Sequence, residues 1–302
     1  MSNIKISIGI LACNEEANIK LLLEDILGQK EERFYIEEII VISDGSTDRT
    51  ADFAQSVKDK RIKVISHNDR IGKPARSNEL FDLFKGDVLI RLDADVKFYD
   101  ESVIKKLVYP FILDNKTAIV CGNQKPWPPK KYTEKISHFG LQVWAEAVSR
   151  VKDHSDKYYC TGRIMAFSKL FLESFRFPPS QGSSEDMYIF YFAKTKGLKV
   201  AIAKDAIIYF KLPATFKDYF KQMSRFMNSE GLIRNQFDEK VINEHETITG
   251  LIKAWALLKK SVTSPPQIVL GFVIMQILAR YFASSHENPA WDTSVTTKNF
   301  HS

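Results

Sequence analysis

Short apolar runs alternate with segments of helical period over the first third of the chain. In chain order, the runs and the segments between them are residues 5–13, 18–29, 37–44, 48–58, 61–67, 74–85 and 87–95. Runs that are almost continuously apolar are typical of strands buried on both faces, and apolar residues three or four apart are typical of helices. Strand–helix alternation of this kind predicts an α/β fold built on a parallel sheet with right-handed crossovers.

The pattern is less regular beyond residue 100. The sequence predicts further strands at residues 116–124, 162–167 and 198–210. It also predicts a helix over 133–153, and a helix over 183–197 that ends at a glycine. The same sheet is therefore expected to continue, with helices between its strands.

Polar residues stand where three of the predicted strands end. Asn14 and Glu15 follow the first strand, Asp44 ends the second, and Asp93 and Asp95 follow the fourth. In open α/β sheets, ligands bind outside the carboxyl ends of the strands, so these residues are expected to share one site. Each also has a simpler explanation as a turn, a helix cap or a solvated loop. A strand-end carboxylate contributes little to a core, so Asp44 is expected to matter more for binding than for stability.

The charge and cysteine content exclude some functions. The formal net charge is +6, and the Lys and Arg residues are scattered without a nucleic-acid-binding pattern, so no nucleic-acid partner is expected. Cys13, Cys121 and Cys160 lack metal-ligand spacing, and an odd, sparse set favours a reducing compartment over a disulfide framework. The apolar run before Cys13 includes Leu11, which is not small, so a buried strand is favoured over a signal segment and a cytoplasmic protein is expected.

An ordered set of motifs marks a family. The stretches are "LACNEE", "VISDGSTD", "RIGKPARSNEL", "LIRLDADV", "CTGRIMAF", "SSEDMYIFY" and "KQMSRF". In this order and spacing, over about residues 5 to 230, they resemble the family 2 glycosyltransferases with a GT-A fold. The resemblance implies a Rossmann-like, mostly parallel mixed sheet flanked by helices. It also implies transfer of a sugar from a nucleoside-diphosphate sugar to an acceptor hydroxyl, with inversion.

The resemblance implies a divalent cation, Mg²⁺ or Mn²⁺, which would neutralise the charge of the donor diphosphate. Asp95 would hold the metal directly or through water, and Asp93 would share the metal or reach the ribose. Asp44 would bind the base and Glu15 would lie near the ribose. The implied donor-site residues are Ala12, Asn14, Glu15, Asp44, Lys73 and Asp93. For Lys73, a place near the diphosphate or sugar and a solvated turn before a helix both stay open.

The later motifs imply the acceptor side of the site. Asp186 is the expected general base that removes the proton from the acceptor hydroxyl, while Glu185 is either catalytic or a helix-start carboxylate. The residues implied to contact the diphosphate and the acceptor are Gly162, Arg163, Gln222, Arg225 and Phe226. The last three would share one helical face, which an ordinary amphipathic helix would also show. Phe226 stands where processive synthases usually have Trp, so processivity is not implied.

The composition changes near the carboxyl end. Residues 247–286 contain no Asp or Glu and four Lys or Arg, and Pro265-Pro266 divides them into two expected helices. Ile248, Leu251, Ile252 and Trp255 would share a face, which is typical of an interfacial helix and equally of a helix docked on a core. The second apolar run is short for a bilayer span.

These features predict a catalytic domain over residues 1–232 and a helical region over 233–302. The helical region is expected to associate with the cytoplasmic face of a membrane through 247–286, with a packed helical appendage as the alternative. The acceptor class is then a lipid-linked or cell-surface glycan, either a glycan or a polyprenyl-linked acceptor.

Two other functions remain as alternatives. A sugar-phosphate nucleotidyltransferase would carry a Gly-rich, Arg-containing loop after the first strand, where this chain has "ACNEEAN". A non-catalytic nucleotide-sugar binding protein would lack Asp95 or Asp186, and both are present.

Overall fold

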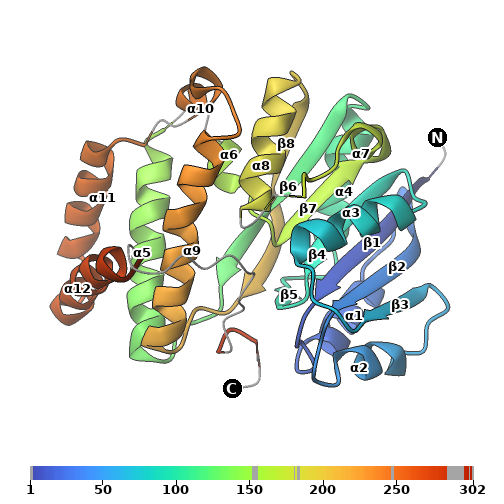
Figure 1. The fold of residues 1–302 in the computed structure, drawn as a ribbon, viewed down its shortest axis with the longest axis horizontal. Coiled ribbons are helices and arrows are strands. Elements are labelled where there is room, and N and C mark those ends of the chain that lie inside the picture. Colours follow the sequence, from blue (N-terminus) through green and yellow to red (C-terminus); the bar gives the residue numbers. More distant parts are fainter. Residues whose placement is uncertain are drawn as a thin grey trace. The chain divides into compact units, whose positions relative to one another are not determined.

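The fold was taken from a computed structural model of the chain. It describes residues 3–151, 156–179, 181, 184–245, 248–283, 296–298 and 300. The chain divides into two compact units (Figure 1), each considered by itself. The sheet unit comprises Met1–Lys125, Tyr159–Lys211 and Lys298–Ser302, and the helical unit comprises Pro126–Tyr158 and Leu212–Thr297.

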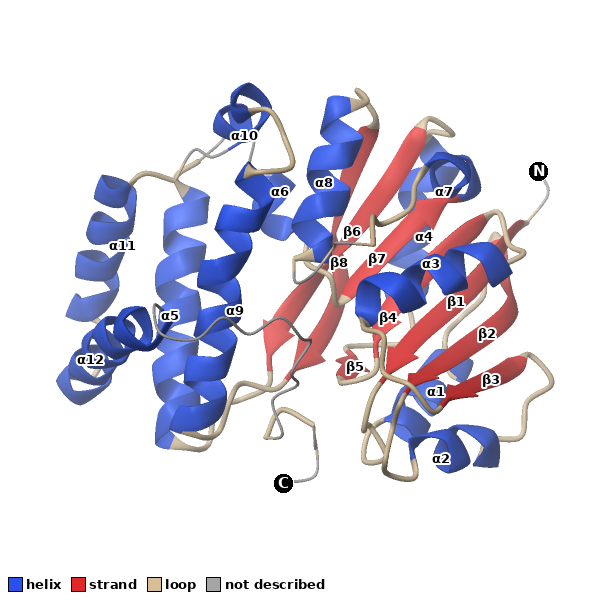
Figure 2. Ribbon diagram, viewed as in Figure 1, coloured by secondary structure: helices blue, strands red, loops and turns tan. Residues whose placement is uncertain are grey.

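Eight strands of the described residues form one mixed sheet in the order β3-β2-β1-β4-β7-β6-β8-β5 (Figure 2). Their bounds are β1 (Ile4–Ala12), β2 (Phe34–Asp44), β3 (Ile62–His67), β4 (Val88–Asp93), β5 (Val96–Phe98), β6 (Thr117–Pro126), β7 (Ile164–Ser168) and β8 (Lys199–Phe210). β1 pairs in parallel with β2 and β4, and β2 pairs in parallel with β3. β7 is antiparallel to β4 and to β6, and β5 is antiparallel to β8.

The expected α/β mixed sheet is therefore confirmed, but "mostly parallel" holds only for β1 to β4. Ala94 and Asp95 alone separate β4 from β5, too short a link for the crossover that a parallel neighbour needs. β5 instead pairs with β8. The sequence analysis missed this three-residue strand, because it is shorter than any periodic signal.

Helices cover both faces of the sheet. The helices of this unit are α1 (Ile19–Leu27), α2 (Thr50–Ser56), α3 (Lys73–Leu83), α4 (Val103–Leu113), α7 (Lys169–Ser174) and α8 (Glu185–Thr195). α1 and α4 pack on one face, in a core that includes Ile8 of β1 and Ile90 of β4. On the other face, Phe81 of α3 contacts Phe167 of β7 and Phe175, which follows α7.

Close packing of α3 on β1 requires a glycine. A Cβ at Gly9 would lie 2.2 Å from Leu80 Cδ2, so a larger residue there would push the helix away from the sheet. This contact fixes the position of α3, whose first residue, Lys73, enters the candidate site.

The helical unit packs around α5 (Tyr132–Ser149), which contacts α9 (Phe216–Arg234), α11 (Gly250–Val262) and α12 (Pro266–Ala283). α10 (Glu239–His245) follows α9. Of the short α6 (Asp156–Tyr159), the first three residues belong to the helical unit and Tyr159 to the sheet unit. Residues 152–153 of the predicted 133–153 helix lie outside the described residues. The two helices expected on either side of Pro265-Pro266 are confirmed.

The helical face that was expected at a membrane interface needs correction. Within the described ranges, no helix combines the length and the apolar character that crossing a membrane requires. Ile248, Ile252 and Trp255 pack against a core that includes Phe139 of α5, so three of the four residues expected at an interface are docked on protein. Leu251 alone of the four is exposed. Thr247 and residues 284–286 of the expected membrane segment lie outside the described residues, and the division at residue 232 stays a prediction.

Candidate active site

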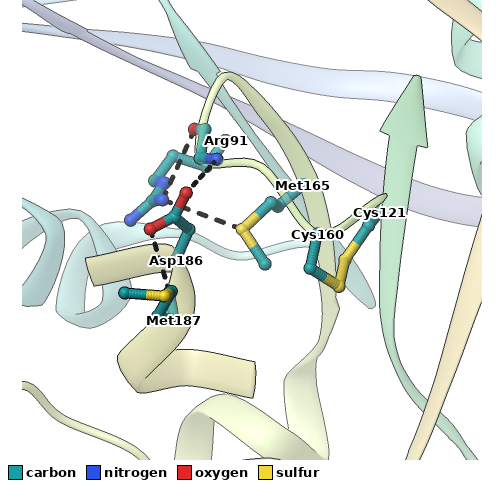
Figure 3. Close-up of a disulfide and its surroundings, with 7 residues drawn as sticks. Arg91, Cys121, Cys160, Met165, Asp186 and Met187 are labelled. Carbon is teal, nitrogen blue, oxygen red and sulfur yellow. Dashed lines mark hydrogen bonds between the residues drawn. A yellow bond between two sulfur atoms is a disulfide. The ribbon is translucent and has the colours of Figure 1, made fainter. Parts of the chain in front are cut away.

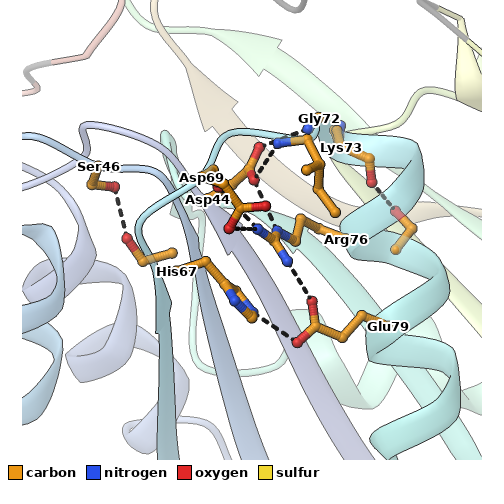
Figure 4. Close-up of polar contacts among 11 residues, drawn as sticks. Asp44, Ser46, His67, Asp69, Gly72, Lys73, Arg76 and Glu79 are labelled. Carbon is orange, nitrogen blue, oxygen red and sulfur yellow. Dashed lines mark hydrogen bonds and ion pairs between the residues drawn. The ribbon is translucent and has the colours of Figure 1, made fainter.

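Asp44, at the end of β2, is fully buried and bonded through both carboxylate oxygens. Its Oδ1 accepts from the Ile71 N–H at 3.0 Å and from Arg76 Nε at 2.8 Å, and its Oδ2 accepts from the Gly72 N–H at 2.9 Å. Figure 4 shows the guanidinium of Arg76 facing Asp44 on one side and Glu79 on the other. Asp44 therefore holds the loop that leads into α3.

This geometry corrects the expectation that Asp44 matters little for stability. Asp44→Ala would leave the Nε–H of the buried Arg76 and two backbone N–H groups without their acceptor. We expect a loss of about 3 kcal/mol in the free energy of unfolding, because removing one partner of a buried ion pair is strongly destabilising. Asp69→Ala is the matched control, since Asp69 also pairs with Arg76 but is largely exposed. Urea titration that ranks the two variants equally would contradict the structural role.

The end of β1 is held by hydrogen bonds to the segment after β2. The Asn14 N–H donates to Ser46 Oγ at 3.1 Å, and Asn14 Oδ1 accepts from the Thr47 N–H at 2.8 Å. The Glu15 N–H donates to Thr50 Oγ1 at 2.7 Å. α1 begins after Asn18, so Asn14 and Glu15 are not its cap residues. The first two strand ends are therefore built into one rigid rim.

Three carboxylates share one corner of this rim. Burial, and then the charge of Asp95, raise the pKa of Glu15 to about 8. Burial, and then the charge of Asp93, raise the pKa of Asp95. Positive charge stabilises carboxylates that raise each other's pKa, and here Lys73 lies beside Asp93 and Lys298 beside Glu15.

The carboxylates do not form a complete metal site by themselves. Among the described residues, no three His, Cys, Asp or Glu side chains converge as a ready set of ligands. Mg²⁺ is commonly bound through one or two carboxylates together with substrate phosphates, and Asp93 and Asp95 fit that donor set.

Lys73 joins the donor side of the site to the acceptor side. Its Nζ lies 2.6 Å from Asp93 Oδ1 and 2.7 Å from Glu185 Oε1, and its side chain is almost fully buried. Burial opposes the Lys73 charge, but the two carboxylates outweigh it and raise the pKa of Lys73. Lys73 is thus not a solvated turn residue, the alternative left open above.

Glu185 and Asp186, the first residues of α8, differ in proton affinity. Burial opposes the charge of Glu185, but Lys73 and Arg91 outweigh it and lower the pKa of Glu185 to about 2. Burial, and then the charge of Glu185, raise the pKa of Asp186. Neighbouring acids with pKa values pushed apart are typical of sites that assign them different roles.

The segment before β7 positions Asp186. The Gly162 N–H donates to Asp186 Oδ2 at 3.1 Å, and the Met187 N–H donates to Asp186 Oδ1 at 2.9 Å (Figure 3). A Cβ added at Gly162 would lie 3.5–3.6 Å from Asp186 Cβ, Arg91 Nη2 and Lys73 Nζ. Gly162 therefore stands at the centre of the charged groups.

Arg163 lies next to the acidic corner. Its carbonyl accepts from the Asp93 N–H at 3.1 Å, and its guanidinium lies over the Phe210 ring at 4.2 Å. Its positive charge also lowers the pKa of Asp95, against the stronger effect of burial. Gly162 and Arg163 are thus brought together with Asp93, Asp95 and Asp186, as expected for one site.

Cys160, two residues before Gly162, forms a disulfide with Cys121 of β6 (Figure 3). The sequence analysis favoured a reducing compartment over a disulfide framework, and this disulfide differs from that expectation. Cysteines 39 positions apart carry no local signal of their pairing. Cys13 is free and buried.

Two residues at the rim adopt backbone conformations that are unusual for a residue with a side chain. Asn14 has φ 57° and Ser184 has φ 74°. Residues held in the left-handed region cluster at functional sites, because the surrounding structure must stabilise them. Asn14 lies two residues after the end of β1, next to Glu15, and Ser184 immediately precedes Glu185, so both stand beside predicted site residues.

Comparisons with known proteins identify the family. The sequence profile described as "Glycosyl transferase family 2" matches residues 7–175, more than half of the chain. The chain belongs to glycosyltransferase family 2. The matched region includes the ends of β1, β2 and β4, Lys73, Gly162 and Arg163.

Relatives in the family differ in what they transfer. The O-antigen chain rhamnosyltransferase RfbN of Salmonella typhimurium is 27% identical over 184 residues, 59% of this chain and 58% of that protein. The dolichol-phosphate mannosyltransferase of Pyrococcus furiosus is 30% identical over 160 residues, 50% of this chain and 44% of that protein. The poly-β-1,6-N-acetyl-D-glucosamine synthase of Staphylococcus aureus is 24% identical over 233 residues, 76% and 56% of the two proteins. The chain spans about half the length of these curated relatives.

The fold is shared with a solved mannosyltransferase structure. The mannosyltransferase PcManGT from Pyrobaculum calidifontis, in complex with GDP-Man and Mn²⁺, superposes with a TM-score of 0.63 at 14% identity. The match covers 94% of this chain and 84% of that chain. This similarity confirms the GT-A type of fold expected from the motifs.

Four predicted site residues have not yet been placed: Ala12, Gln222, Arg225 and Phe226. Ala12 packs in the core beneath the sheet, so its side chain does not face the rim. Gln222, Arg225 and Phe226 lie on α9 of the helical unit, where Phe226 is exposed. The family role implied for these three residues stays a prediction.

The sequence analysis missed three charged residues of the sheet unit. Arg76 binds Asp44, and Lys298 lies 2.9 Å from Glu15. Arg91 is fully buried, and its nearest polar contact is Ser77 Oγ at 3.2 Å. Arg91 had a signal, since an arginine within an apolar strand, two residues before Asp93, must share the face of Asp93. Lys298 had none, because it meets Glu15 from the other end of the sequence.

Proposed function

We propose that the protein transfers a sugar from a nucleoside-diphosphate sugar to a hydroxyl of a lipid-linked or cell-surface glycan, with inversion. The observation that carries the proposal is the chain of contacts from Asp93 through Lys73 to Glu185, next to Asp186. It connects the residues implied for donor binding with those implied for the acceptor. Membership of family 2 supports the reaction class.

Asp186 is the proposed general base. Its raised pKa brings the carboxylate closer to the pH at which it must accept a proton, which favours general-base catalysis. Glu185 is held ionised by Lys73 and has a pKa of about 2, so it has little affinity for a proton near neutral pH. Glu185 is therefore proposed as the residue that positions Lys73.

Asp95 and Asp93 are the proposed ligands of Mg²⁺ or Mn²⁺. When bound, the metal would act as a Lewis acid that stabilises the charge of the leaving diphosphate. Asp44 and Glu15 would then lie on the nucleoside side of the donor, and Lys73 near its diphosphate or sugar. The solved PcManGT complex with Mn²⁺ has the same fold and is consistent with this arrangement in kind.

A donor screen tests the proposed function. The purified chain is heated with a panel of UDP-, GDP- and dTDP-sugars in the presence of Mn²⁺, and the melting temperature is recorded. A ligand at 100 times its Kd adds about 2.7 kcal/mol of stability, so a true donor raises the melting temperature. A nucleotidyltransferase would instead be stabilised by a sugar phosphate with a nucleoside triphosphate, and this pair is included in the panel.

We further propose that the exposed apolar residues of α11 and α12 rest on the surface of an anionic membrane. On each helix these residues recur at helical spacing and form an apolar stripe: Leu251, Leu258 and Val262 on α11, and Leu270, Ile274, Ile277 and Tyr281 on α12. An apolar helical face flanked by Lys and Arg is typical of interfacial binding, and residues 247–286 carry no acid to repel anionic lipid. Of the four residues that the sequence analysis placed on a shared face, only Leu251 belongs to these stripes.

Vesicle sedimentation tests the membrane proposal. The wild-type chain is expected to sediment with phosphatidylglycerol vesicles and much less with phosphatidylcholine vesicles. Ile274→Glu combined with Ile277→Glu should remove this binding, because both side chains would carry charge into the interface. Leu170→Glu is the control, since Leu170 is an apolar residue of the sheet unit that is more exposed than Ile274 and Ile277. Equal sedimentation of all three proteins would contradict the proposal. So would a wild-type dimer that dissociates when the double substitution is made.

A further inference from the structure

Lys298 reaches the rim of the sheet from 284 positions further along the chain than Asn14. Its ammonium lies 2.9 Å from Glu15 Oε1 and donates to the carbonyl of Asn14 at 2.9 Å and to that of Cys13. Its own carbonyl accepts from Asn18 Nδ2 at 2.6 Å. An ammonium has three N–H donors, and these contacts use all three.

The contacts place a positive charge in the acidic corner of the site. The side chains of Lys298 and Glu15 are 13% and 8% exposed, so the pair is largely withdrawn from solvent. The charge of Lys298 also lowers the pKa of Asp95, so it acts on a proposed metal ligand as well as on Glu15. Lys298 thus neutralises the same group of carboxylates that a divalent cation would neutralise.

We propose that Lys298 is a residue of the donor site that holds the Glu15 corner when no donor is bound and competes with the metal–nucleotide complex. This inference rests on the proposed function. A divalent ion on Asp95 and an ammonium on Glu15 repel each other, and the repulsion is strong in a partly buried site. Lys298 also covers the carbonyls of Cys13 and Asn14, at the strand end that is expected to face the nucleoside.

The competition predicts tighter binding when Lys298 is removed. When a site is open for only part of the time, its apparent Kd is the intrinsic Kd divided by the fraction of time for which it is open. We therefore expect Lys298→Ala to lower the apparent Kd for a nucleotide with Mn²⁺ by about 3- to 30-fold. Lys298→Arg retains the charge and should bind like the wild type.

The test is calorimetric titration of UDP and of GDP in the presence of Mn²⁺, with binding of Mn²⁺ alone followed by the paramagnetic resonance of the free ion. Lys20→Ala serves as the control, because it removes one positive charge from an exposed helix position. Thermal unfolding of each variant checks that the fold is retained.

The outcomes separate this inference from the proposed function. Tighter binding in Lys298→Ala alone supports competition. Weaker binding would show that Lys298 helps to hold the nucleotide, and unchanged binding would show that it does not reach the site; either overturns the inference and leaves the proposed function intact. Absence of binding of both nucleotides and of every nucleotide sugar in the donor panel by every protein, wild type included, overturns both.

Discussion

Asp186→Asn is expected to lower kcat by about 10²–10⁴-fold, the usual contribution of a positioned general base. Asn keeps the shape of the side chain and its single oxygen can still accept one of the two N–H groups, from Gly162 or from Met187. It cannot take the proton of the acceptor hydroxyl. Because the loss lies in the transition state, kcat and kcat/KM should fall together. The donor Kd, measured by calorimetry, should be nearly unchanged.

The pH dependence gives a second measurement of the same variant. The base must be deprotonated, so the rate falls as the pH drops through the pKa of Asp186. Burial and the charge of Glu185 raise that pKa, so the acidic limb should lie above the value of about 3.9 for a free Asp. In Asp186→Asn this limb should be absent.

Glu185→Gln separates the two neighbouring acids. It removes one of the two carboxylates that pair with Lys73. We therefore expect a smaller loss of kcat than in Asp186→Asn, together with a higher Kd for the donor. Normal turnover by Asp186→Asn, with an inactive Glu185→Gln, would show that the base has been assigned to the wrong residue.

Asp95→Ala is expected to abolish detectable transfer and to remove the effect of Mn²⁺ on donor binding. Asp95 lies in a corner with Asp93 and Glu15, and a cation held there would stabilise the leaving diphosphate. The measurement is donor binding by calorimetry with and without Mn²⁺, together with turnover. Asp205→Ala is a control for the loss of one carboxylate, because Asp205 is an exposed residue of β8. Turnover of Asp95→Ala near the wild-type rate in Mn²⁺ would exclude the metal-binding role.

The sequence predicted the strand ends because the relevant rules are local. Asp93 follows an apolar run directly, and the rule that ligands bind at the carboxyl ends of strands placed it with Asp44 and Glu15. The structure keeps these residues on one rim. Lys73 was expected either near the donor diphosphate or sugar or in a solvated turn before a helix. No local pattern could show that it is buried between Asp93 and Glu185.

The rest of the site depends on contacts between distant segments. Arg76 lies inside a quoted motif, yet its bond to Asp44 requires the loop after β3 to fold back over the end of β2. The Cys121–Cys160 disulfide and the Lys298–Glu15 pair each join segments that no periodicity relates. The strands after β4, apart from β5, were predicted, but their directions were not, since strand direction depends on links that carry no pattern.

The most direct test of the account is release of nucleoside diphosphate from a nucleotide sugar by the purified chain. A donor identified by thermal shift is incubated with Mn²⁺, with and without an acceptor glycan, and the released diphosphate is followed over time. The account predicts release that stops when the metal is chelated and that is absent in Asp95→Ala. Release that continues at the same rate in Asp95→Ala and after chelation, or no release from any stabilising nucleotide sugar, would contradict it.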